Sequence, residues 1–332
     1  RVTFDLTGLP PTPQELSASY HDSSPEALKT VVDRLLDSPH FGERLGRHWL
    51  DVARYAESTG KNINLAYPHA WRYRDYVIEA FNQDKPYDQF LREQLAGDHL
   101  PTANDRQRAE QLVATGFLAM GTKSVNEANP RQFALDLADE QIDTVTQAFL
   151  GVTASCARCH DHKFDPITQR EYYSLAGIFL STDTRYGTFF AAQNRSAAEL
   201  IELPKGAREP VATGVLTSEE RREKEEELAR VTQEAEDLAN ATFGQTMSSF
   251  GGREPRNSQL LLLLRMNQIG LLETELASYD ERGNKRPLAM GVMDQPTRSE
   301  ENRTRRKETP LYGSSTPQQA IASRYLERDG RF

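Results

Sequence analysis

The sequence predicts a mainly α-helical protein, and three features of the chain support this class. Apolar residues recur at i, i+3, i+4, i+7 and i+8 between Leu28 and Leu36, which is the spacing of one helix face. A longer apolar stripe with alternating spacings of three and four runs from Leu135 to Val152. The stretch from Thr217 to Ala241 is dense in Glu, Lys and Arg, which is typical of a solvated or coiled helix.

The first part of the chain is expected to be helical after a strand-like and turn-like start over residues 1–10. The first helix has a plausible cap in Asp22, Ser23 and Ser24, ahead of Pro25. A second helix is predicted over residues 41–58, with these residues on its apolar face: Phe41, Leu45, His48, Val52 and Tyr55. Further helices fit residues 71–82, 87–96 and 105–116.

The long apolar stripe predicts a helix that ends just before Ser155, and both cysteines follow directly. Another short helix is expected over residues 168–179. We therefore predict a helical haem-binding domain over residues 1–184, for the reason given below.

The second half of the chain is predicted in three parts. Residues 185–216 mix Gly, Pro, Ala and polar residues without a period, which indicates an irregular connection. Residues 217–280 are expected to form a charged helical hairpin or coiled coil, with the partner helix at 259–279. Residues 281–332 are interpreted as a truncated, partly β or poorly ordered start of a further domain, with a strand at 287–294 and a segment at 295–309 too charged for a core.

Composition restricts the function classes. The chain has 332 residues and a net charge of −9, with acidic side chains spread along it, which argues against a nucleic-acid partner. The longest apolar run, residues 260–264, is too short for a transmembrane segment, and residues 1–10 do not resemble a signal peptide. Because these residues read as the middle of a longer sequence, we expect a fragment or a processed form. Phosphate-loop, Gly-x-Ser-x-Gly and His-Glu-x-x-His motifs do not occur in the sequence.

The two cysteines of the chain form one motif with the residue that follows them, Cys156-Ala157-Arg158-Cys159-His160. Two thiols at this spacing reach the two vinyl groups of one haem, and the next histidine turns its Nε2 to the iron. The motif therefore predicts one covalent haem c, with His160 as the proximal iron ligand.

Other interpretations of the cysteines remain open. A redox or structural Cys156–Cys159 disulfide leaves the adjacent histidine unexplained and lacks a thioredoxin-like strand-to-helix context. A zinc site of Cys156, Cys159, His160 and His162 has suitable ligand types, but zinc sites usually place their second ligand pair many residues away. The thiols are also compatible with a coincidental arrangement.

Several sequence blocks resemble a known family. They are residues 4–13, 38–44, 48–55, 70–75, 86–90, 94–98 and 156–166. These blocks are similar to the large planctomycete cytochrome proteins, a secreted, multidomain, cytochrome c-like family. The resemblance covers roughly residues 1–182. It implies a domain of unknown biochemical function, commonly with a cytochrome c domain upstream and an uncharacterised domain downstream.

The ligand on the distal side of a haem decides between electron transfer and catalysis. His48 is the first candidate for a distal iron ligand, with a satisfied core histidine as the alternative, and Met120 is a weaker candidate. His40 reads as a cap or surface residue, and His162 as a residue near a propionate. The remaining two histidines considered, His69 and His99, are poor ligand candidates.

Other residues were considered for roles around the haem. Arg72 and Arg74 are candidates for binding the propionates, with surface ion pairs as the alternative. Asp51 and Arg54 are weak candidates for catalytic acid and base groups. Trp49 and Trp71 are candidates for packing on the porphyrin, as well as ordinary core residues.

The expected function is electron transfer between the haem and a redox partner protein or another cytochrome domain. A haem-dependent oxidase or peroxidase-like enzyme is one alternative. A structural or carbohydrate-surface interaction module with a Cys156–Cys159 disulfide is another. Covalent haem attachment implies a periplasmic, cell-envelope or extracellular location.

Overall fold

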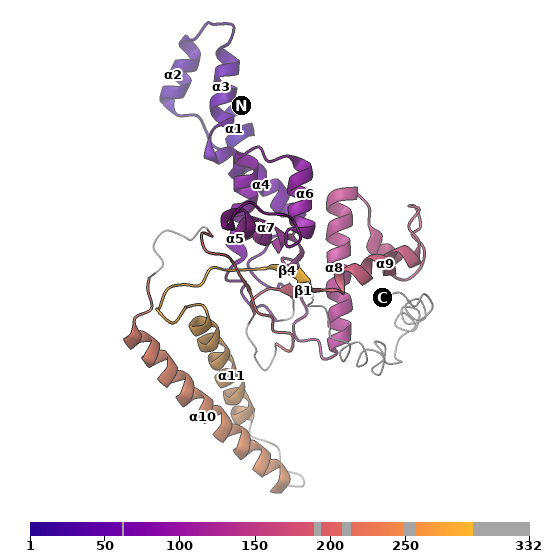
Figure 1. Ribbon diagram of the computed structural model, residues 1–332, viewed down its shortest axis with the longest axis vertical. Helices are drawn as coiled ribbons and strands as arrows, with labels where there is room; N and C mark the ends of the chain where they lie inside the picture. The colour runs from indigo at the N-terminus through magenta and orange to yellow at the C-terminus, as the bar shows by residue number, and fades with distance from the viewer. Residues whose placement is uncertain (62, 189–193, 208–213, 249–255, 295–332) are drawn as a thin grey trace.

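The computed structural model describes residues 1–332 except 62, 189–193, 208–213, 249–255 and 295–332. The described part is mostly helical with a few short strands, which confirms the predicted class (Figure 1). The predicted segment at 295–309 lies outside the described residues. None of the described helices is long and apolar enough to cross a lipid bilayer.

Of the first three helices, the second and third project away from the rest of the molecule, and the first lies at their base (Figure 1). They are α1 (Val2–Thr7), α2 (Pro13–His21) and α3 (Ala27–Leu36). The strand-like start predicted for the chain is wrong, because α1 ends on Gly8 in the left-handed region (φ 70°) and packs on α3 and α4. A capping box begins α2, in which Thr12 Oγ1 accepts from the Glu15 N–H and the Thr12 N–H donates to Glu15 Oε2.

Helix α4 (Pro39–Val52) crosses α5 (Ala70–Asn82) closely. The buried residues of α4 are Gly42, Gly46 and Leu50. The predicted apolar face, which includes His48 and Val52, is therefore wrong: these two side chains are exposed, and the buried face is offset by about one residue along the helix. A Cβ on Gly42 would lie 2.3 Å from the Ile78 carbonyl oxygen. Because Gly42 and Gly46 have no side chains, the face of α4 that carries them packs closely on α5 and is the buried face.

The main core lies between α4, α5, α6 (Tyr87–Ala96), α7 (Asp105–Ala114) and the 3₁₀ helix η1 (Thr115–Leu118). Trp49 Nε1 donates to Tyr73 Oη (3.0 Å) and to Gln94 Oε1 (2.9 Å) inside this core. The Trp49 ring also packs against Phe90 and Phe117. Buried polar groups are therefore paired with one another while the aromatic rings fill the space.

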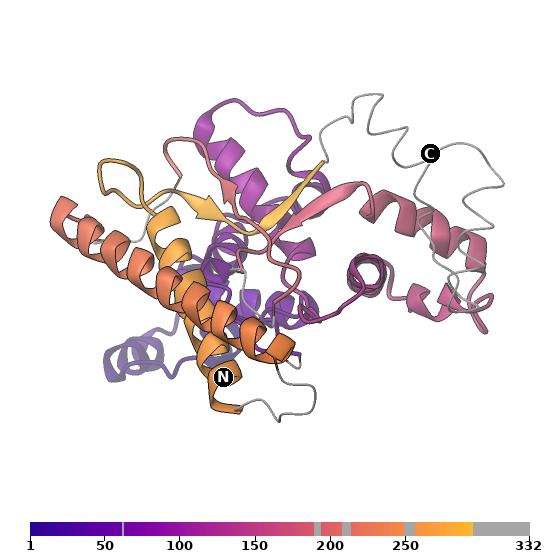
Figure 2. The ribbon, with the colours of Figure 1, turned by 90° about the horizontal axis from the view of Figure 1, so that it is seen from below.

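A second unit consists of α8 (Pro130–Leu150), the 3₁₀ helix η2 (Ala154–Arg158) and α9 (Gln169–Phe179). It has a small core of its own, formed by Ile142, Ala154, Ala157, Tyr172, Tyr173 and Ala176. In both Figure 1 and Figure 2 this unit lies to one side of the main core.

Two pairs of short strands connect distant parts of the chain. Strand β1 (Thr182–Arg185) leaves α9 and pairs antiparallel with β4 (Gly291–Asp294) (Figure 2), and β2 (Ile201–Glu202) pairs with β3 (Leu288–Ala289). The strand expected at 287–294 is thus present in two pieces. Because Met290 and Val292 belong to the main core, this segment packs on the helices that precede it.

The charged region forms a hairpin of α10 (Ser218–Ser248) and α11 (Arg256–Ala277). Val231 and Leu272 are buried in it, and ion pairs such as Lys224–Glu275 and Arg265–Glu234 (both 2.9 Å) join its two helices. The residue ranges predicted for separate domains, 1–184, 185–216, 217–280 and 281–332, stay a prediction.

Candidate functional site

The cysteine loop follows the left-handed Gly151 (φ 67°), which ends α8. Cys156 lies within η2 and Cys159 directly after it, and both side chains are exposed. Residues i and i+3 of a 3₁₀ turn lie on the same side of the turn. The two sulfur atoms are therefore presented to solvent from one short, rigid turn, with no disulfide between them in the structure.

Arg158, between the cysteines, fastens this turn to α8. Its guanidinium contacts Asp139 Oδ2 (2.9 Å) and Asp136 Oδ1 (3.0 Å), while Tyr172 Oη donates to Asp139 Oδ1 (2.5 Å). Burial of Arg158 opposes its charge, but the hydrogen bond to Asp136 and the charge of Asp139 outweigh burial, so its pKa is raised. Burial and the bond to Asp139 also raise the pKa of Tyr172. Arg158 therefore stays charged and Tyr172 stays protonated near neutral pH.

His160 presents an imidazole suited to binding a metal ion. Its side chain is exposed, and its Nδ1 lies 2.6 Å from the Asp161 carbonyl oxygen. Because a carbonyl only accepts hydrogen bonds, Nδ1 is the donor in this contact, and Nε2 is the ring nitrogen whose lone pair is available for a metal in the neutral imidazole. Histidines that ligate metals usually donate their other ring N–H to such a partner, which fixes the tautomer and the ring orientation.

His162 has a structural position. Its side chain is 5% exposed, and Nδ1 accepts from the backbone N–H groups of Asp165 (2.8 Å) and Phe164 (3.2 Å). Nε2 then carries the proton and donates to Thr153 Oγ1 at 3.2 Å. Both nitrogens are therefore engaged in holding the loop, and a bond from His162 to a propionate stays a prediction.

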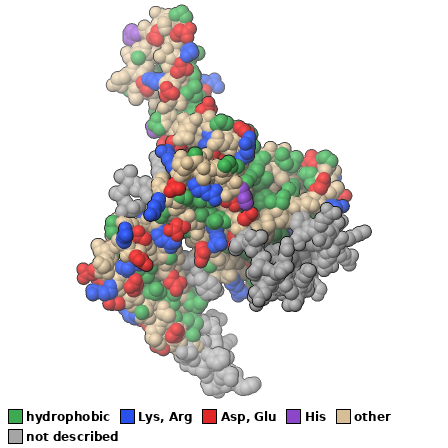
Figure 3. Space-filling view, viewed as in Figure 1, with side chains coloured by type: hydrophobic (Ala, Val, Ile, Leu, Met, Phe, Trp, Pro, Cys, Tyr) green, Lys and Arg blue, Asp and Glu red, His purple; other side chains and the backbone are tan. Residues whose placement is uncertain are grey.

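Large apolar side chains near the cysteines in sequence are exposed to solvent. Leu150 is 68%, Phe164 82% and Ile178 59% exposed. Figure 3 shows hydrophobic side chains gathered over the part of the surface formed by α8 and α9. A surface of this kind on a soluble protein commonly marks a place where something binds. Two thiols, an imidazole Nε2 and apolar neighbours are a set of groups that fits a haem c.

His48 is the histidine of α4 that the sequence puts forward as a distal ligand. It is exposed on α4, and within the described residues it makes no hydrogen bond and no ion pair. The neighbouring Trp49 stacks on Phe149 near the end of α8, with 5.9 Å between ring centroids. Helix α4 thus reaches the end of α8 from which the cysteine loop departs.

The other candidates for haem contacts lie in the main core or in local ion pairs. Arg72 is 5% exposed on α5, with its guanidinium carbon 4.6 Å above the Trp71 ring, and Arg74 pairs with Asp75 (2.9 Å). Helix α5 packs on α4, α7 and η1. The two arginines therefore lie on an element that packs against the main core.

The remaining weak candidates have ordinary environments. Met120 is 1% exposed in the main core, and the exposed His40 pairs with Glu43 (2.7 Å). Asp51 is exposed and pairs with Arg47. Arg54 differs from these residues, because it lines a cavity.

Arg54 lines a polar cavity beside the cysteine loop, which no spacing pattern along the chain indicates. It has a volume of about 390 Å³, and its lining includes Arg54, Lys123, Glu140 and Ser155. Lys123 is 2% exposed and donates to the carbonyl oxygens of Ala119 (2.6 Å) and Gly121 (2.8 Å). Burial lowers the pKa of Lys123 to about 8, opposed by the charge of Glu140 and assisted by Arg54.

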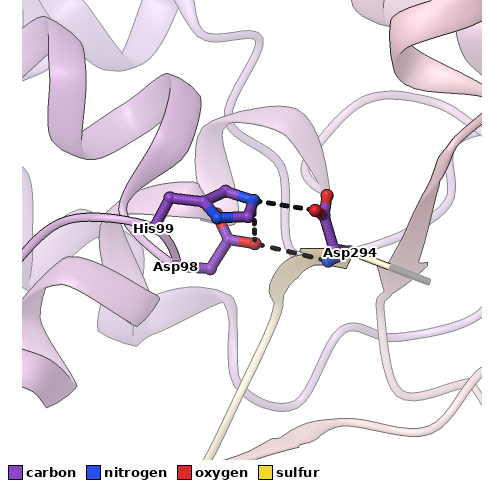
Figure 4. A group of neighbouring side chains, drawn as sticks. All are labelled: Asp98, His99 and Asp294. Carbon is purple, nitrogen blue, oxygen red and sulfur yellow. Dashed lines mark hydrogen bonds and ion pairs between the residues drawn. The ribbon is translucent and has the colours of Figure 1, made fainter. Parts of the chain in front are cut away.

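His99 forms a cluster with two carboxylates, shown in Figure 4. Its Nε2 lies 2.9 Å from Asp294 Oδ2 and 3.6 Å from Asp98 Oδ2, and the Asp294 N–H donates to Asp98 Oδ2 (3.3 Å). The cluster connects the end of α6 to β4. We interpret it as an anchor for the strand, because the imidazole contacts both carboxylates and the Asp294 backbone N–H donates to Asp98.

The fold and the loop together define a class, namely a mostly helical protein that presents a Cys-x-x-Cys-His turn on its surface. The chain belongs to the family described as PSCyt2, protein of unknown function (DUF1549), whose family model matches residues 1–184. This match confirms the resemblance at the level of the family, over α1–α9 and the cysteine loop. A search of curated proteins and a search of solved structures each found no match.

Proposed function

We propose that the cysteine loop carries one covalent haem c and that the protein transfers electrons. Thioether bonds join the haem to Cys156 and Cys159, and His160 Nε2 is the proximal iron ligand. The observation that supports this most directly is the hydrogen bond from His160 Nδ1 to the Asp161 carbonyl, which makes Nε2 the nitrogen available for iron in a turn that also exposes two thiols. When bound, the haem supplies one-electron redox chemistry.

The residues around the loop hold and cover this group. Arg158, at the centre of the turn, and His162, just after it, hold the loop in one shape, so the thiols and the imidazole are positioned before attachment. Leu150 and Phe164 offer apolar surface that a porphyrin can remove from water. The partner that would exchange electrons with the haem is a redox protein or another cytochrome domain. Covalent attachment retains the cofactor in the periplasm, the cell envelope or the extracellular medium, where we place the protein.

We propose His48 as the distal ligand. It is supported by its exposure, its lack of partners in the described part of the chain, and the contact of the adjacent Trp49 with α8. With both His160 and His48 bound to it, a haem iron would be suited to electron transfer and not to catalysis, because a substrate would find no open position.

The experiment for haem attachment is production of the chain together with a cytochrome c maturation system, followed by intact mass and a pyridine haemochrome spectrum. We expect the mass of the protein plus one haem and the spectrum of two thioether bonds. Cys156→Ala and Cys159→Ala should each shift the spectrum to that of a single thioether bond. A haem-free product beside a correctly matured control cytochrome would refute the proposal, and alkylation of the thiols would then report a disulfide.

The distal ligand is tested by the ferric spectrum of the haem-loaded protein. Wild type is expected to be low-spin and insensitive to cyanide, whereas His48→Ala should become high-spin and bind cyanide. His40→Ala, an exposed histidine at the start of the same helix, is the matched control and should remain low-spin. A high-spin wild type that reacts with peroxide would instead support the peroxidase-like alternative.

A further inference from the structure

The cluster of His99 with Asp98 and Asp294 brings three metal-binding groups to one point (Figure 4). One ligand atom from each residue, an imidazole nitrogen or a carboxylate oxygen, lies within 4.8 Å of the other two. Zinc and other divalent first-row metals accept imidazole and carboxylate ligands together. The side chains of His99 and Asp294 are 58% and 56% exposed, so an ion can reach the cluster from solvent.

The spacing of the ligand atoms fits a single ion. Zinc binds nitrogen and oxygen at about 2.0–2.1 Å, so two ligand atoms of a tetrahedral zinc ion lie about 3.3 Å apart. His99 Nε2 lies 2.9 Å from Asp294 Oδ2 and 3.6 Å from Asp98 Oδ2, one distance on each side of that value. Small side-chain adjustments therefore suffice to place all three atoms around one ion.

The charge of the cluster is not balanced by neighbouring cations. With both carboxylates ionised, the cluster keeps a net negative charge even when the imidazole is protonated. In the part of the chain that the structure describes, neither carboxylate forms an ion pair with a lysine or an arginine. The Asp98 side chain is only 9% exposed, and its hydrogen bond among these residues is the long one from the Asp294 N–H (3.3 Å). A carboxylate so far removed from water calls for a cation.

Asp98 and His99 are held in place by the backbone around the end of α6. They follow Gly97, where a Cβ would lie 2.0 Å from the Gln111 carbonyl oxygen, so the chain packs closely on α7 here. Arg108 Nη1 donates to the carbonyl oxygens of Gly97 (3.2 Å) and Asp98 (2.8 Å). Two of the three ligands are thus positioned by contacts that do not involve their own side chains.

Asp294 reaches the cluster from a distant part of the chain. It is the last residue of β4 and is paired with Thr182, the first residue of β1. Strand β1 follows α9, so it leads out of the unit that carries the cysteine loop. The cluster therefore lies where the main core meets the strand pair that connects it to this unit.

We propose that Asp98, His99 and Asp294 bind one zinc ion, with water in the remaining coordination position. The ion neutralises the two carboxylates and joins the end of α6 to β4. Calcium and magnesium are less suited to this site, because both prefer about six or more oxygen ligands and an imidazole supplies none. The site is separate from the proposed haem, since none of its ligands belongs to the cysteine loop.

The test is titration calorimetry of the full, tag-free chain with zinc chloride, after any free thiols have been blocked with iodoacetamide. Blocking is needed because Cys156 and Cys159 are exposed and thiolates also bind zinc. We expect one equivalent of zinc to bind, and calcium and magnesium to bind more weakly. His99→Ala and Asp294→Asn should each weaken zinc binding at least about tenfold, since loss of a mere outer-shell partner costs about 10–100-fold.

His40→Ala is the matched control, because His40 is an exposed histidine that contacts a single carboxylate, that of Glu43 (2.7 Å). This variant should bind zinc as wild type does. Asp294→Asn changes an exposed side chain and keeps its size, so it carries the test should His99→Ala unfold. Hydrogen exchange supplies a second measurement: zinc should slow exchange at the amides of β4 in wild type and not in Asp294→Asn.

The proposal is wrong if no zinc binds, if the two site variants bind zinc as wild type does, or if calcium or magnesium binds more tightly than zinc. Zinc binding that leaves exchange in β4 unchanged would contradict the role of the ion as a link to this strand. Haem attachment and its failure both leave the three ligands intact, so the two proposals can fail separately.

Discussion

Arg158 Nη1 lies 2.9 Å from Asp139 Oδ2, and this contact connects the centre of the Cys-x-x-Cys-His turn to α8. Asp139 also lines the polar cavity. The cysteine loop and the cavity thus share one carboxylate, and α8 is the support for both.

Arg158→Met should destabilise the protein, because Asp136 and Asp139 lose their cation while remaining partly buried. We expect a loss of about 1–3 kcal/mol in the free energy of unfolding, measured by urea denaturation. Arg47→Met removes an exposed ion pair with Asp51 and should cost less than about 1 kcal/mol. Equal effects of the two substitutions would show that the contact of Arg158 is no stronger than a surface pair.

His162→Leu should loosen the loop, since the N–H groups of Phe164 and Asp165 lose their acceptor and Thr153 loses its donor. Hydrogen exchange at these two amides is expected to accelerate, while the amides within α5 keep their protection. His21→Leu, on the exposed surface of α2, is the control. Unchanged exchange at residues 164 and 165 would contradict the structural role given to His162.

Gly42→Ala tests the crossing of α4 and α5. The added Cβ would meet the Ile78 carbonyl oxygen at 2.3 Å, a backbone atom that cannot turn aside, so the helices must separate. We expect a loss of about 3 kcal/mol in the free energy of unfolding. Gly214→Ala, whose Cβ has nothing within 4 Å, should change it by less than about 0.5 kcal/mol. A denaturation midpoint of Gly42→Ala equal to that of wild type would contradict the close approach of α4 and α5.

His69 should make the stability of the protein depend on pH below neutrality. Burial lowers its pKa to about 4, with the charges of Arg72 and Lys285 acting in the same direction. Between pH 6.5 and pH 4, His69 therefore binds a proton in the unfolded chain but not in the folded chain. The free energy of unfolding consequently falls as the pH falls. The loss amounts to about 3 kcal/mol across this range. His69→Gln should flatten the profile relative to wild type, and a parallel profile would exclude His69 as its source.

Much of the helical fold was predictable because its signals are local. The predicted helix at 87–96 has the bounds of α6, and those at 71–82 and 168–179 agree with α5 and α9 to within one residue at each end. Helix α2 was missed although its start, Thr12-Pro13-Gln14-Glu15, carries the pattern of a capping box. The buried face of α4 was misassigned because hydrophobic spacing does not register glycines that bury a helix by having no side chain.

The site was only half predictable for a similar reason. Cys156, Cys159 and His160 lie within five consecutive residues, so their relation can be read from the chain. The cavity brings Arg54 next to Glu140, which is 86 residues away, and depends on a left-handed backbone at Arg54. Such an arrangement follows from tertiary packing and leaves no spacing pattern in the sequence.

The pairing of β1 with β4 joins residues 182–185 to residues 291–294. The chain therefore leaves this strand pair after β1 and returns to it at β4, and the α10–α11 hairpin is an insertion between the two strands. Leu216, which precedes α10, and Gly283, which follows α11, are also joined, because the Leu216 N–H donates to the Gly283 carbonyl oxygen (2.8 Å). The hairpin can consequently lengthen or shorten by whole helical turns without displacing the cysteine loop or the main core.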